Sequence, residues 1–399
     1  MRSKLQVRSP QEFILAELDR DPGENMSPSK QLIQVVPQLT PMRCGVTDHA
    51  IPLARELEAA FEIDTAFVVL NSREKCDLAY PIIHCAPQEL LQACLSLSNG
   101  RPGSILVHLS GYGYSRDGAP TLLADALTKV RKDGRFRVAV YFHELFATGM
   151  PWRSAFWYSR RQRNAVRRIA EECDLRVTST RCYADWLERK SDRERGYSVQ
   201  VLPVFSTVGE ARELLPIVQR QQTMAVFGLS ATRRTAYKEL KSARNLLRDL
   251  GIREIADLGP ESEVPLEVHG VPVRRRGVLA PADLVRELAQ ATFGFLSYAP
   301  ALAAKSGVFA AYCAHGTVPV ITKAFNGEAD GLRDGRELLS PGTVKTALAS
   351  GLEHCSKAAW LWYCSHRLNA HAATYARWLS NSDALAPAVT RGKAEIERT

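Results

Sequence analysis

The strongest constraint on the fold is an alternation of strand-like and helix-like segments that runs along the chain and then starts again. The apolar, strand-like segments of the first series are QLIQVVPQL, FEIDTAFVVL, GSILVHLSGYGY (which ends in a glycine-rich loop), FRVAVYFHELF and LRVTST, and those of the second are TMAVFGLS, IREIADLG, TFGFLSYA and TVPVIT. Strands that alternate with helices indicate a parallel sheet with helices on both faces. The sequence therefore predicts an α/β protein with two Rossmann-like, doubly wound domains that face each other across a cleft.

The two series meet at a stretch of irregular sequence, LPVFSTVGEARELLPIVQRQQ. A chain of 399 residues has room for two domains and additional elements, since a domain takes about 100–200 residues. One short helix is expected at residues 10–19. We expect an N-terminal extension (1–30), a first Rossmann-like domain (31–205), a linker (206–222), a second Rossmann-like domain (223–357), and a C-terminal helix and tail (358–399) that packs back on the first domain.

Composition excludes several classes of protein. Hydrophobic residues make up 45% and charged residues 24%, as in ordinary globular proteins, and no apolar run approaches the roughly 18–20 residues that cross a bilayer. The start of the chain has no apolar core of the signal-peptide type, so we expect a cytoplasmic protein that can also sit at the inner face of a membrane. The nine cysteines are scattered, without a CxxC or a zinc-finger spacing, and are expected to be reduced structural thiols. The net charge of +9 favours anionic partners.

The first loop that can carry chemistry follows the first predicted strand and contains Gly45, Val46 and Asp48. Glycine lets the backbone approach a ligand, and the start of the next helix attracts anions. The loop lacks the GxGxxG pattern, so no nicotinamide cofactor is expected. The alternative is an ordinary α/β turn.

Two histidines end neighbouring predicted strands of the first domain. His108 precedes the glycine-rich loop that holds Tyr112, and His143 precedes Glu144. A histidine at a strand end can act as a base, orient a sugar hydroxyl, or be a satisfied structural residue. Two at successive strand ends favour a functional site.

The second domain contributes two groups of residues that suit a phosphate. Cations at Arg233, Arg234 and Lys238 follow its first strand and could neutralise a diphosphate, although a solvated helix start has the same pattern. Further along, Ser306 is a good helix N-cap, Gly307 and Val308 offer amides at the helix start, and Lys305 adds charge.

The order of these motifs resembles that of GT-B glycosyltransferases, in particular the retaining, nucleotide-sugar-dependent branch (group 1, family 4-like). The similar segments are MRCGVTDHAIPLARELE, FHELFATG, VLPVFSTVGE, FGLSATRRTAYKEL and SGVFAAYCAHGTVPVI. The resemblance implies a metal-independent hexosyltransferase-like enzyme that moves a sugar from a nucleotide-diphosphate sugar to an acceptor hydroxyl, without a further cofactor. A glutamate pair that this branch carries near the last helix is missing, because its places fall at Ala303 and Ala311.

The resemblance also implies roles for the candidate residues. His143, Lys238 and Arg233 are the catalytic candidates, and no residue is expected to bind a metal. The donor-binding candidates are Gly45, Val46, Arg234, Lys305, Ser306, Gly307 and Val308, and the acceptor-side candidates are Asp48, His108, Tyr112 and Glu144. The missing glutamates keep open a second function, a non-catalytic GT-B-like protein that binds nucleotides or glycans.

Residues 151–168 combine aromatic side chains with a row of arginines that includes Arg160, Arg161 and Arg163. Such a surface suits an anionic membrane that carries a lipid-linked acceptor, or nucleic acid, as in a DNA-modifying glycosyltransferase. It also suits a plain solvated helix. The acceptor therefore stays open among a glycan, a lipid-linked sugar, a small molecule and nucleic acid.

Overall fold

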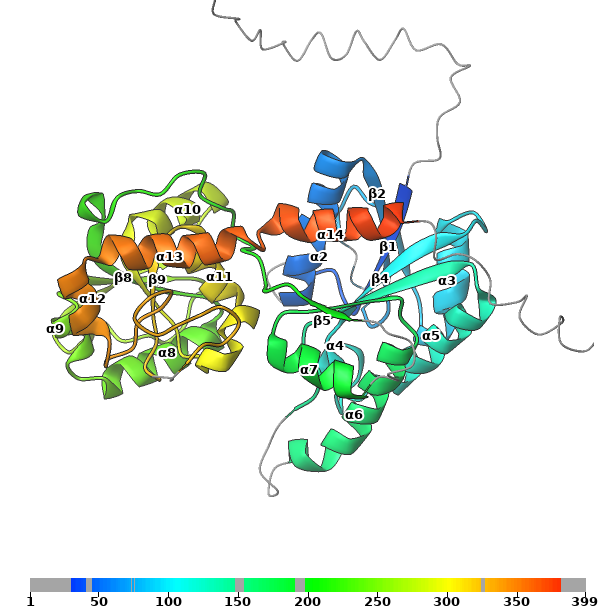
Figure 1. Cartoon of the computed structure of the whole chain (residues 1–399), viewed down its shortest axis with the longest axis horizontal. Coiled ribbons are helices and arrows are strands. Elements are labelled where there is room, and N and C mark those ends of the chain that lie inside the picture. Colours follow the sequence, from blue (N-terminus) through cyan, green and yellow to red (C-terminus); the bar gives the residue numbers. More distant parts are fainter. Residues whose placement is uncertain are drawn as a thin grey trace, which may run out of the picture.

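The strands form two separate sheets, one from each series of the sequence (Figure 1). The computed structural model describes residues 30–40, 45–72, 74, 76–147, 154–190, 198–323 and 327–381, except for the side chains of residues 154–158 and 190. The helix expected at residues 10–19 lies outside the described residues. The alternation of strands and helices confirms the predicted α/β class with doubly wound sheets.

The first sheet has seven strands in the order β3-β2-β1-β4-β5-β6-β7, and every neighbouring pair is parallel. Its order reverses between β1 and β4. In doubly wound sheets, such a reversal opens a crevice at the carboxyl ends of the strands. The strands are β1 (Lys30–Val36), β2 (Ile63–Val69), β3 (Ile82–His84), β4 (Gly103–Leu109), β5 (Phe136–Phe142), β6 (Leu175–Thr178) and β7 (Val199–Val201).

Helices cover both faces of the first sheet, because alternate residues of each strand point to opposite sides. Leu32 and Leu106 belong to one core, whereas Ile33 and Val107 belong to another. The helices of this half are α2 (Gly45–Phe61), α3 (Leu90–Leu97), α4 (Gly111–Tyr114), α5 (Thr121–Asp133), α6 (Ser154–Glu171) and α7 (Arg181–Lys190), with a 3₁₀ turn η1 (Pro87–Glu89).

The second sheet has six strands in the order β10-β11-β9-β8-β12-β13, and only the β10–β11 pair is antiparallel. Its order reverses between β8 and β12. The strands are β8 (Gln221–Phe227), β9 (Glu254–Leu258), β10 (Glu267–Val268), β11 (Val271–Gly277), β12 (Ala291–Phe295) and β13 (Val318–Val320). The helices are α8 (Ser230–Ser242), α9 (Leu246–Asp249), α10 (Pro281–Gln290), α11 (Gly307–Ala314) and α12 (Val344–Ser350), with 3₁₀ turns η3 (Ile217–Gln219) and η4 (Pro300–Lys305).

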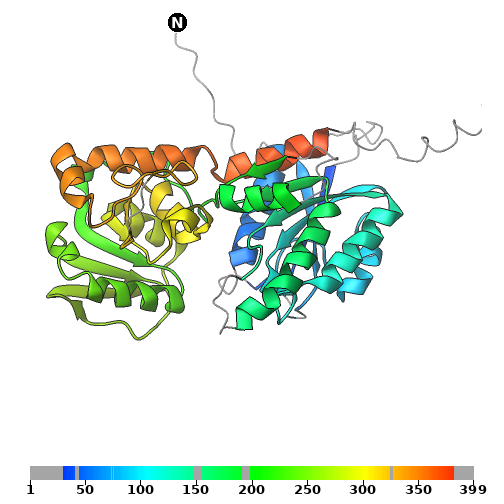
Figure 2. The same ribbon diagram turned by 60° about the horizontal axis from the view of Figure 1, so that its bottom comes forward.

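Two C-terminal helices connect the halves where the sequence predicts one long helix. Helix α13 (Leu352–Cys364) packs on α11 in the second half, and α14 (Leu368–Ser380) returns to pack on α2 of the first (Figures 1 and 2). The helix is interrupted because the Leu368 amide donates to the Glu210 carboxylate, which also accepts a hydrogen bond from Tyr363 Oη. Helix α14 therefore lies on the first half of the chain, and residue 358 lies within α13.

One apolar core continues from the first sheet into the second half. It joins Leu106 and Tyr141 to Phe309 and Tyr312, with Phe205 of the connecting segment among its members. The halves therefore share buried surface on the side of α2 and α14. Of the helices that the structure describes, none has the length and apolar character needed to span a membrane.

Gly294 of β12 allows a close approach that we expect to limit substitution. An added Cβ would lie 2.5 Å from Cγ of Tyr312. The Tyr312 hydroxyl lies 3.0 Å from both the Ala225 and Phe295 carbonyls, so the ring cannot move away without losing hydrogen bonds. Gly294→Ala should lower the free energy of unfolding by about 1–3 kcal/mol, as overpacking does.

Urea denaturation followed by circular dichroism measures this change. Gly342→Ala is the control, because its added Cβ would meet only Ser340 Oγ at 3.8 Å. Equal stability of Gly294→Ala and the wild type would show that Tyr312 does not restrict this position.

Candidate functional site

Four histidines from four different elements gather at the carboxyl end of the first sheet. His108 is the next-to-last residue of β4, and His143 directly follows β5. His49 comes from the first turns of α2, and His371 from α14. The strand-order reversal between β1 and β4 lies at the same place, where doubly wound proteins bind ligands. His108 and His143, which the sequence places at successive strand ends, thus belong to the same cluster.

Hydrogen bonds orient the His108 ring. Its Nδ1 lies 3.2 Å from His143 Nε2, and its Nε2 lies 2.7 Å from Gln34 Oε1. The amide oxygen of Gln34 only accepts hydrogen bonds, so Nε2 of His108 carries the proton. The lone pair of His108 Nδ1 therefore points toward His143.

His49 occupies the centre of the group. Its ring centroid lies 5.4 Å from that of His108, 4.9 Å from that of His143 and 5.4 Å from that of His371. The side chain is only 1% exposed, and neither ring nitrogen has a hydrogen-bond partner among the described residues. A buried polar group without a partner costs about 1–3 kcal/mol. Nitrogens of His49, His108 and His143 all lie within 4.8 Å of one another, an arrangement that can hold a metal ion.

Burial keeps these imidazoles neutral. Loss of solvation lowers the pKa of His108 to about 3 and that of His371 to about 4. Burial and the neighbouring histidines lower the pKa of both His49 and His143 well below the usual value. Neutral rings retain lone pairs, which can accept protons or bind metal ions.

The second half places a helix N-terminus and a glycine side by side. The Ser306 hydroxyl caps α11 by accepting a hydrogen bond from the Phe309 amide, and the amides of Gly307 and Val308 begin the helix, where intrahelical acceptors are lacking. A Cβ at Gly228, directly after β8, would lie 3.3 Å from Val308 Cγ2. The strand-order reversal between β8 and β12 thus lies beside a helix start that suits an anion.

Lys305 joins this helix start to the first half. Its ammonium nitrogen lies 3.3 Å from the Glu144 carboxylate and 3.2 Å from the Tyr183 hydroxyl. Burial lowers the pKa of Lys305, but Tyr298, Tyr183 and Glu144 raise it further, and the net result is a raised pKa. The charge of Lys305 also acts on His143. We call the contact region of Lys305, Glu144 and Tyr183 the interdomain junction.

No family model and no curated protein sequence matches the chain. Among solved structures, an α-glucosyltransferase in complex with UDP and a 13-mer DNA containing a HMU base has 12% identity and a TM-score of 0.53, over 88% of this chain and 99% of that one. The N-terminal domain of Candida albicans trehalose-6-phosphate phosphatase has 11% identity and a TM-score of 0.56, over 89% and 97%. The α,α-trehalose 6-phosphate synthase from Burkholderia multivorans has 11% identity and a TM-score of 0.52, over 90% and 99%.

The chain has the GT-B fold. At these identities the likeness concerns the fold. It agrees with the two doubly wound sheets of this chain.

Arg233 does not lie where the sequence interpretation placed it. The side chain is only 1% exposed, and its guanidinium donates to the Asp257 carboxylate and to the carbonyls of Gly228 and Pro260. A guanidinium with these partners is not available to a diphosphate, so the expected catalytic role of Arg233 is replaced by a structural one. Arg234 and Lys238 are exposed on α8.

The other candidates near the first sheet have different surroundings. Gly45 is exposed at the start of α2, whereas the Val46 side chain lies in the core and Asp48 is half-buried. Tyr112 is exposed, and its hydroxyl accepts a hydrogen bond from Gln162 Nε2 at 3.3 Å. A Cβ on Gly111 would lie 2.4 Å from the Gly118 carbonyl oxygen. Close packing therefore explains the glycine at this position.

The two positions at which the sequence resemblance implied glutamates, 303 and 311, are buried. Ala303 in η4 is 1% exposed, and Ala311 in α11 is fully buried. Their small side chains belong to the apolar core that joins the halves.

The sequence interpretation did not identify three polar residues of the site: Gln34, His49 and His371. Each lies on the buried face of its strand or helix, where an apolar side chain is typical. Gln34 lies in a buried stretch of β1, and His49 shares a helix face with Val46 and Leu53. A polar side chain on an apolar face was the signal that could have identified them.

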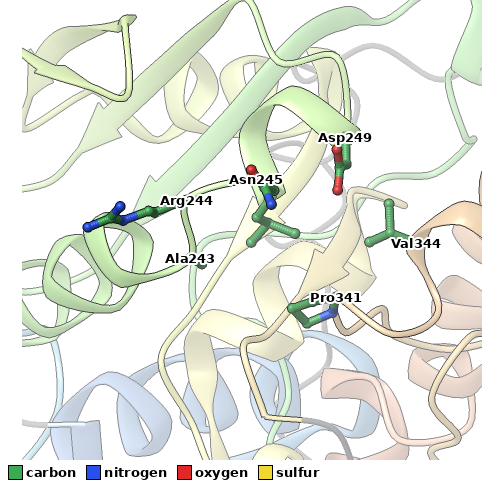
Figure 3. A pocket seen from close by; sticks show the side chains of 7 residues that line it. Ala243, Arg244, Asn245, Asp249, Pro341 and Val344 are labelled. Atoms are coloured by element: carbon green, nitrogen blue, oxygen red, sulfur yellow. The ribbon is translucent and has the colours of Figure 1, made fainter.

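A surface pocket lies elsewhere. Its volume is about 220 Å³, and residues around α9 and the start of α12 line it, among them Arg244, Asn245 and Asp249 (Figure 3). Helix α9 precedes β9, so the pocket lies at the amino ends of the strands. Ligands of doubly wound sheets bind at the opposite ends, and the pocket is therefore not the candidate active site.

We expect Arg233→Ala to destabilise the protein by about 3–5 kcal/mol, because the change leaves the buried Asp257 carboxylate without its partner. Chemical denaturation monitored by tryptophan fluorescence measures the loss. Arg234→Ala is a matched control on the same helix, where an exposed change alters stability by about 0.5 kcal/mol or less. Similar stability of both variants would contradict a structural role for Arg233.

Proposed function

We propose that this chain is a glycosyltransferase that moves a sugar from a nucleotide-diphosphate sugar to an acceptor hydroxyl. The observation that carries the proposal is the interdomain junction, where Lys305 and the start of α11 meet the loop after β5. This contact brings an anion-binding helix start next to His143 and Glu144. The GT-B fold supports the assignment, and neighbours with this fold bind UDP or a UDP-sugar analogue.

The donor diphosphate would bind at the strand-order reversal of the second sheet. Negative charge builds up on the leaving diphosphate as the bond to the sugar breaks, and fixed cations and amides stabilise that charge. The amides of Gly307 and Val308 would contact the phosphates, with Ser306 holding the helix start in place. Lys238, Arg234 and Lys305 would supply positive charge, and Gly45 and Val46 would approach the donor from the first half.

The first half would hold the sugar and the acceptor. His143 would contact the donor sugar at the reacting carbon. The residues Asp48, His108, Tyr112 and Glu144 would serve the acceptor side, and among them His108 would act by orienting His143, since it is buried and donates to Gln34.

We further propose a retaining, hexosyltransferase-like reaction in which no metal binds the diphosphate. With alanine at both 303 and 311, recognition of the ribose and of the sugar must use other groups. Glu239 is one such group, because its carboxylate binds the hydroxyls of Ser297 and Thr322, just after β12 and β13. A cytoplasmic location stays a prediction.

The proposal is tested by the release of nucleoside diphosphate from a panel of nucleotide sugars, with and without pooled acceptors. Release that depends on the acceptor supports transfer. Tight nucleotide binding without turnover of any donor would instead support the non-catalytic binding protein.

Lys238→Ala should reduce turnover by at least about tenfold and should change ground-state nucleotide affinity less, because the cation acts mainly on charge that develops in the transition state. Initial rates and nucleotide titration separate the two effects. Lys241→Ala is the control, since Lys241 is exposed on the same helix. Full turnover by Lys238→Ala would remove Lys238 from the diphosphate site.

For the acceptor, exposed arginines on α6 favour a polyanion. Arg160, Arg161 and Arg163 are exposed, although Arg161 also pairs with Asp117 and Arg163 stacks on Phe146. Trp152, Arg153 and the side chains of Phe156, Trp157 and Tyr158 lie outside the described residues. One GT-B neighbour is complexed with DNA, which favours nucleic acid among the possible acceptors.

Replacing these three arginines with glutamine should weaken binding to DNA, and the loss should shrink as salt rises, because exposed charges act over only about 8 Å at physiological ionic strength. Fluorescence anisotropy with duplex and single-stranded DNA measures binding, and vesicle sedimentation tests anionic lipid. Arg244, Arg248 and Arg253, exposed in the second half, provide a triple-glutamine control with the same change in charge. Absence of binding by the wild type at low salt would favour a small neutral acceptor.

A further inference from the structure

We propose that His49, His108 and His143 form a binding site for one transition-metal ion of the zinc class. This inference does not rest on the proposed transfer reaction. It departs from the sequence-based expectation that no residue of the chain binds a metal.

The imidazole of His49 is buried among aromatic rings. A fully buried imidazole normally finds a partner for at least one nitrogen, yet both nitrogens of His49 lack one among the described residues. Around the ring lie other imidazoles and the aromatic rings of Tyr141 and Phe205. The Tyr141 hydroxyl is already used, because it donates to the Leu202 carbonyl at 2.9 Å. A metal ion would satisfy a nitrogen that the surrounding side chains do not.

The spacing of two histidine nitrogens matches the spacing of zinc ligands. Zinc binds histidine nitrogens at about 2.0–2.1 Å, so two ligands of a tetrahedral site lie about 3.4 Å apart. His108 Nδ1 and His143 Nε2 are 3.2 Å apart, which is close to that separation. The ligand atoms of all three histidines lie within 4.8 Å of one another, so His49 would have to move closer for all three to bind one ion.

Hydrogen bonds orient the rings of His108 and His371. Metal-binding histidines commonly donate their other N–H to an oxygen, which fixes the ring and its lone pair. His108 has this arrangement, because Nε2 donates to Gln34 Oε1 and Nδ1 faces the site. His371 has a similar bond from Nε2 to the Pro203 carbonyl at 2.9 Å, and its buried Nδ1 has no partner among the described residues. His371 thus lies beside His49 as a further nitrogen donor in the wall of the site.

The donor atoms of the three histidines indicate which metal the site would bind. The three ligands are neutral nitrogens without a carboxylate, a set that suits Zn²⁺, Cu²⁺, Ni²⁺ or Co²⁺ and not Mg²⁺ or Ca²⁺. Three histidines leave one tetrahedral position for water or another donor. His143 is half-buried, which offers a path for the ion to enter.

The ion would join three elements that meet at the strand-order reversal. His49 lies on α2, His108 on β4, and His143 directly after β5. Binding would fix α2 against the two strand ends and hold His143 beside Lys305 at the interdomain junction. The metal would therefore stabilise the first half and position His143.

Metal binding is measured on the full chain without a histidine tag, because a tag binds the same ions. After dialysis against a chelator, Zn²⁺ is titrated in competition with a chromophoric chelator, and Co²⁺ serves as the spectroscopic probe. We expect one ion per chain, visible absorption bands of cobalt bound by nitrogen ligands, and a higher melting temperature with Zn²⁺. No nucleotide sugar is present, so the outcome is independent of the transferase proposal.

His49→Phe removes the central ligand and retains an aromatic ring beside Tyr141 and Phe205. It should weaken Zn²⁺ binding by more than about 100-fold, whereas Gln34→Leu, which removes only the support of His108, should weaken it by about 10–100-fold. His354→Ala, exposed on α13, is the control and should bind as the wild type does. Circular dichroism checks that each variant is folded.

If His49→Phe does not fold, His143→Ala replaces it, because His143 is half-buried and tolerates truncation more readily. The proposal is overturned if the folded wild type takes up no stoichiometric Zn²⁺ or Co²⁺. It is also overturned if His49→Phe, or His143→Ala in its place, binds zinc as tightly as the wild type and His354→Ala.

Discussion

The arrangement of both halves depends on one constraint, the reversal of strand order within each parallel sheet. On either side of a reversal, the connections leave the strands in opposite directions, and the carboxyl ends between them stay open to a ligand. In the first sheet, the reversal between β1 and β4 lies beside the start of α2 and His108. In the second, the reversal between β8 and β12 lies beside Gly228 and the start of α11. The two openings meet through Lys305 and Glu144.

Burial decides which basic residues serve the structure and which remain for a ligand. Arg233 and Arg234 are neighbours in sequence, yet one pairs with Asp257 in the core and the other is exposed. A buried guanidinium needs charge-balancing partners because its desolvation is costly. Lys305 is half-buried, and its ammonium is held at the interdomain junction by Glu144 and Tyr183.

Each half has one feature that bears on the proposed function: the histidine cluster in the first half and the start of α11 in the second. In the second half, alanines pack at 303 and 311, and positive charge and helix amides carry the proposed recognition of the donor. In the first half, the four imidazoles of His49, His108, His143 and His371 lie together, and burial keeps them neutral. The proposed metal site lies in the first half, whereas the proposed diphosphate site lies in the second half, at the start of α11. Metal binding at the histidines would therefore leave the chemistry of the diphosphate unchanged.

The sequence by itself determined the two α/β series, the long strands and the places of His108, His143 and the Ser306 cap, because these depend on local apolar periodicity and on helix-start chemistry. It missed the three-residue strands β3 and β7, whereas the equally short β13 was predicted because it lies within the apolar run TVPVIT. Only the tertiary structure showed that Arg233 is buried and that His49 and His371 join His108 and His143. It also showed that the C-terminal helix is interrupted between α13 and α14, where Glu210 binds Leu368. These outcomes depend on contacts between residues far apart in the chain. The sequence pattern can show that a polar residue lies on the apolar face of a helix or strand. Which residue it contacts there depends on how the helices and strands pack together.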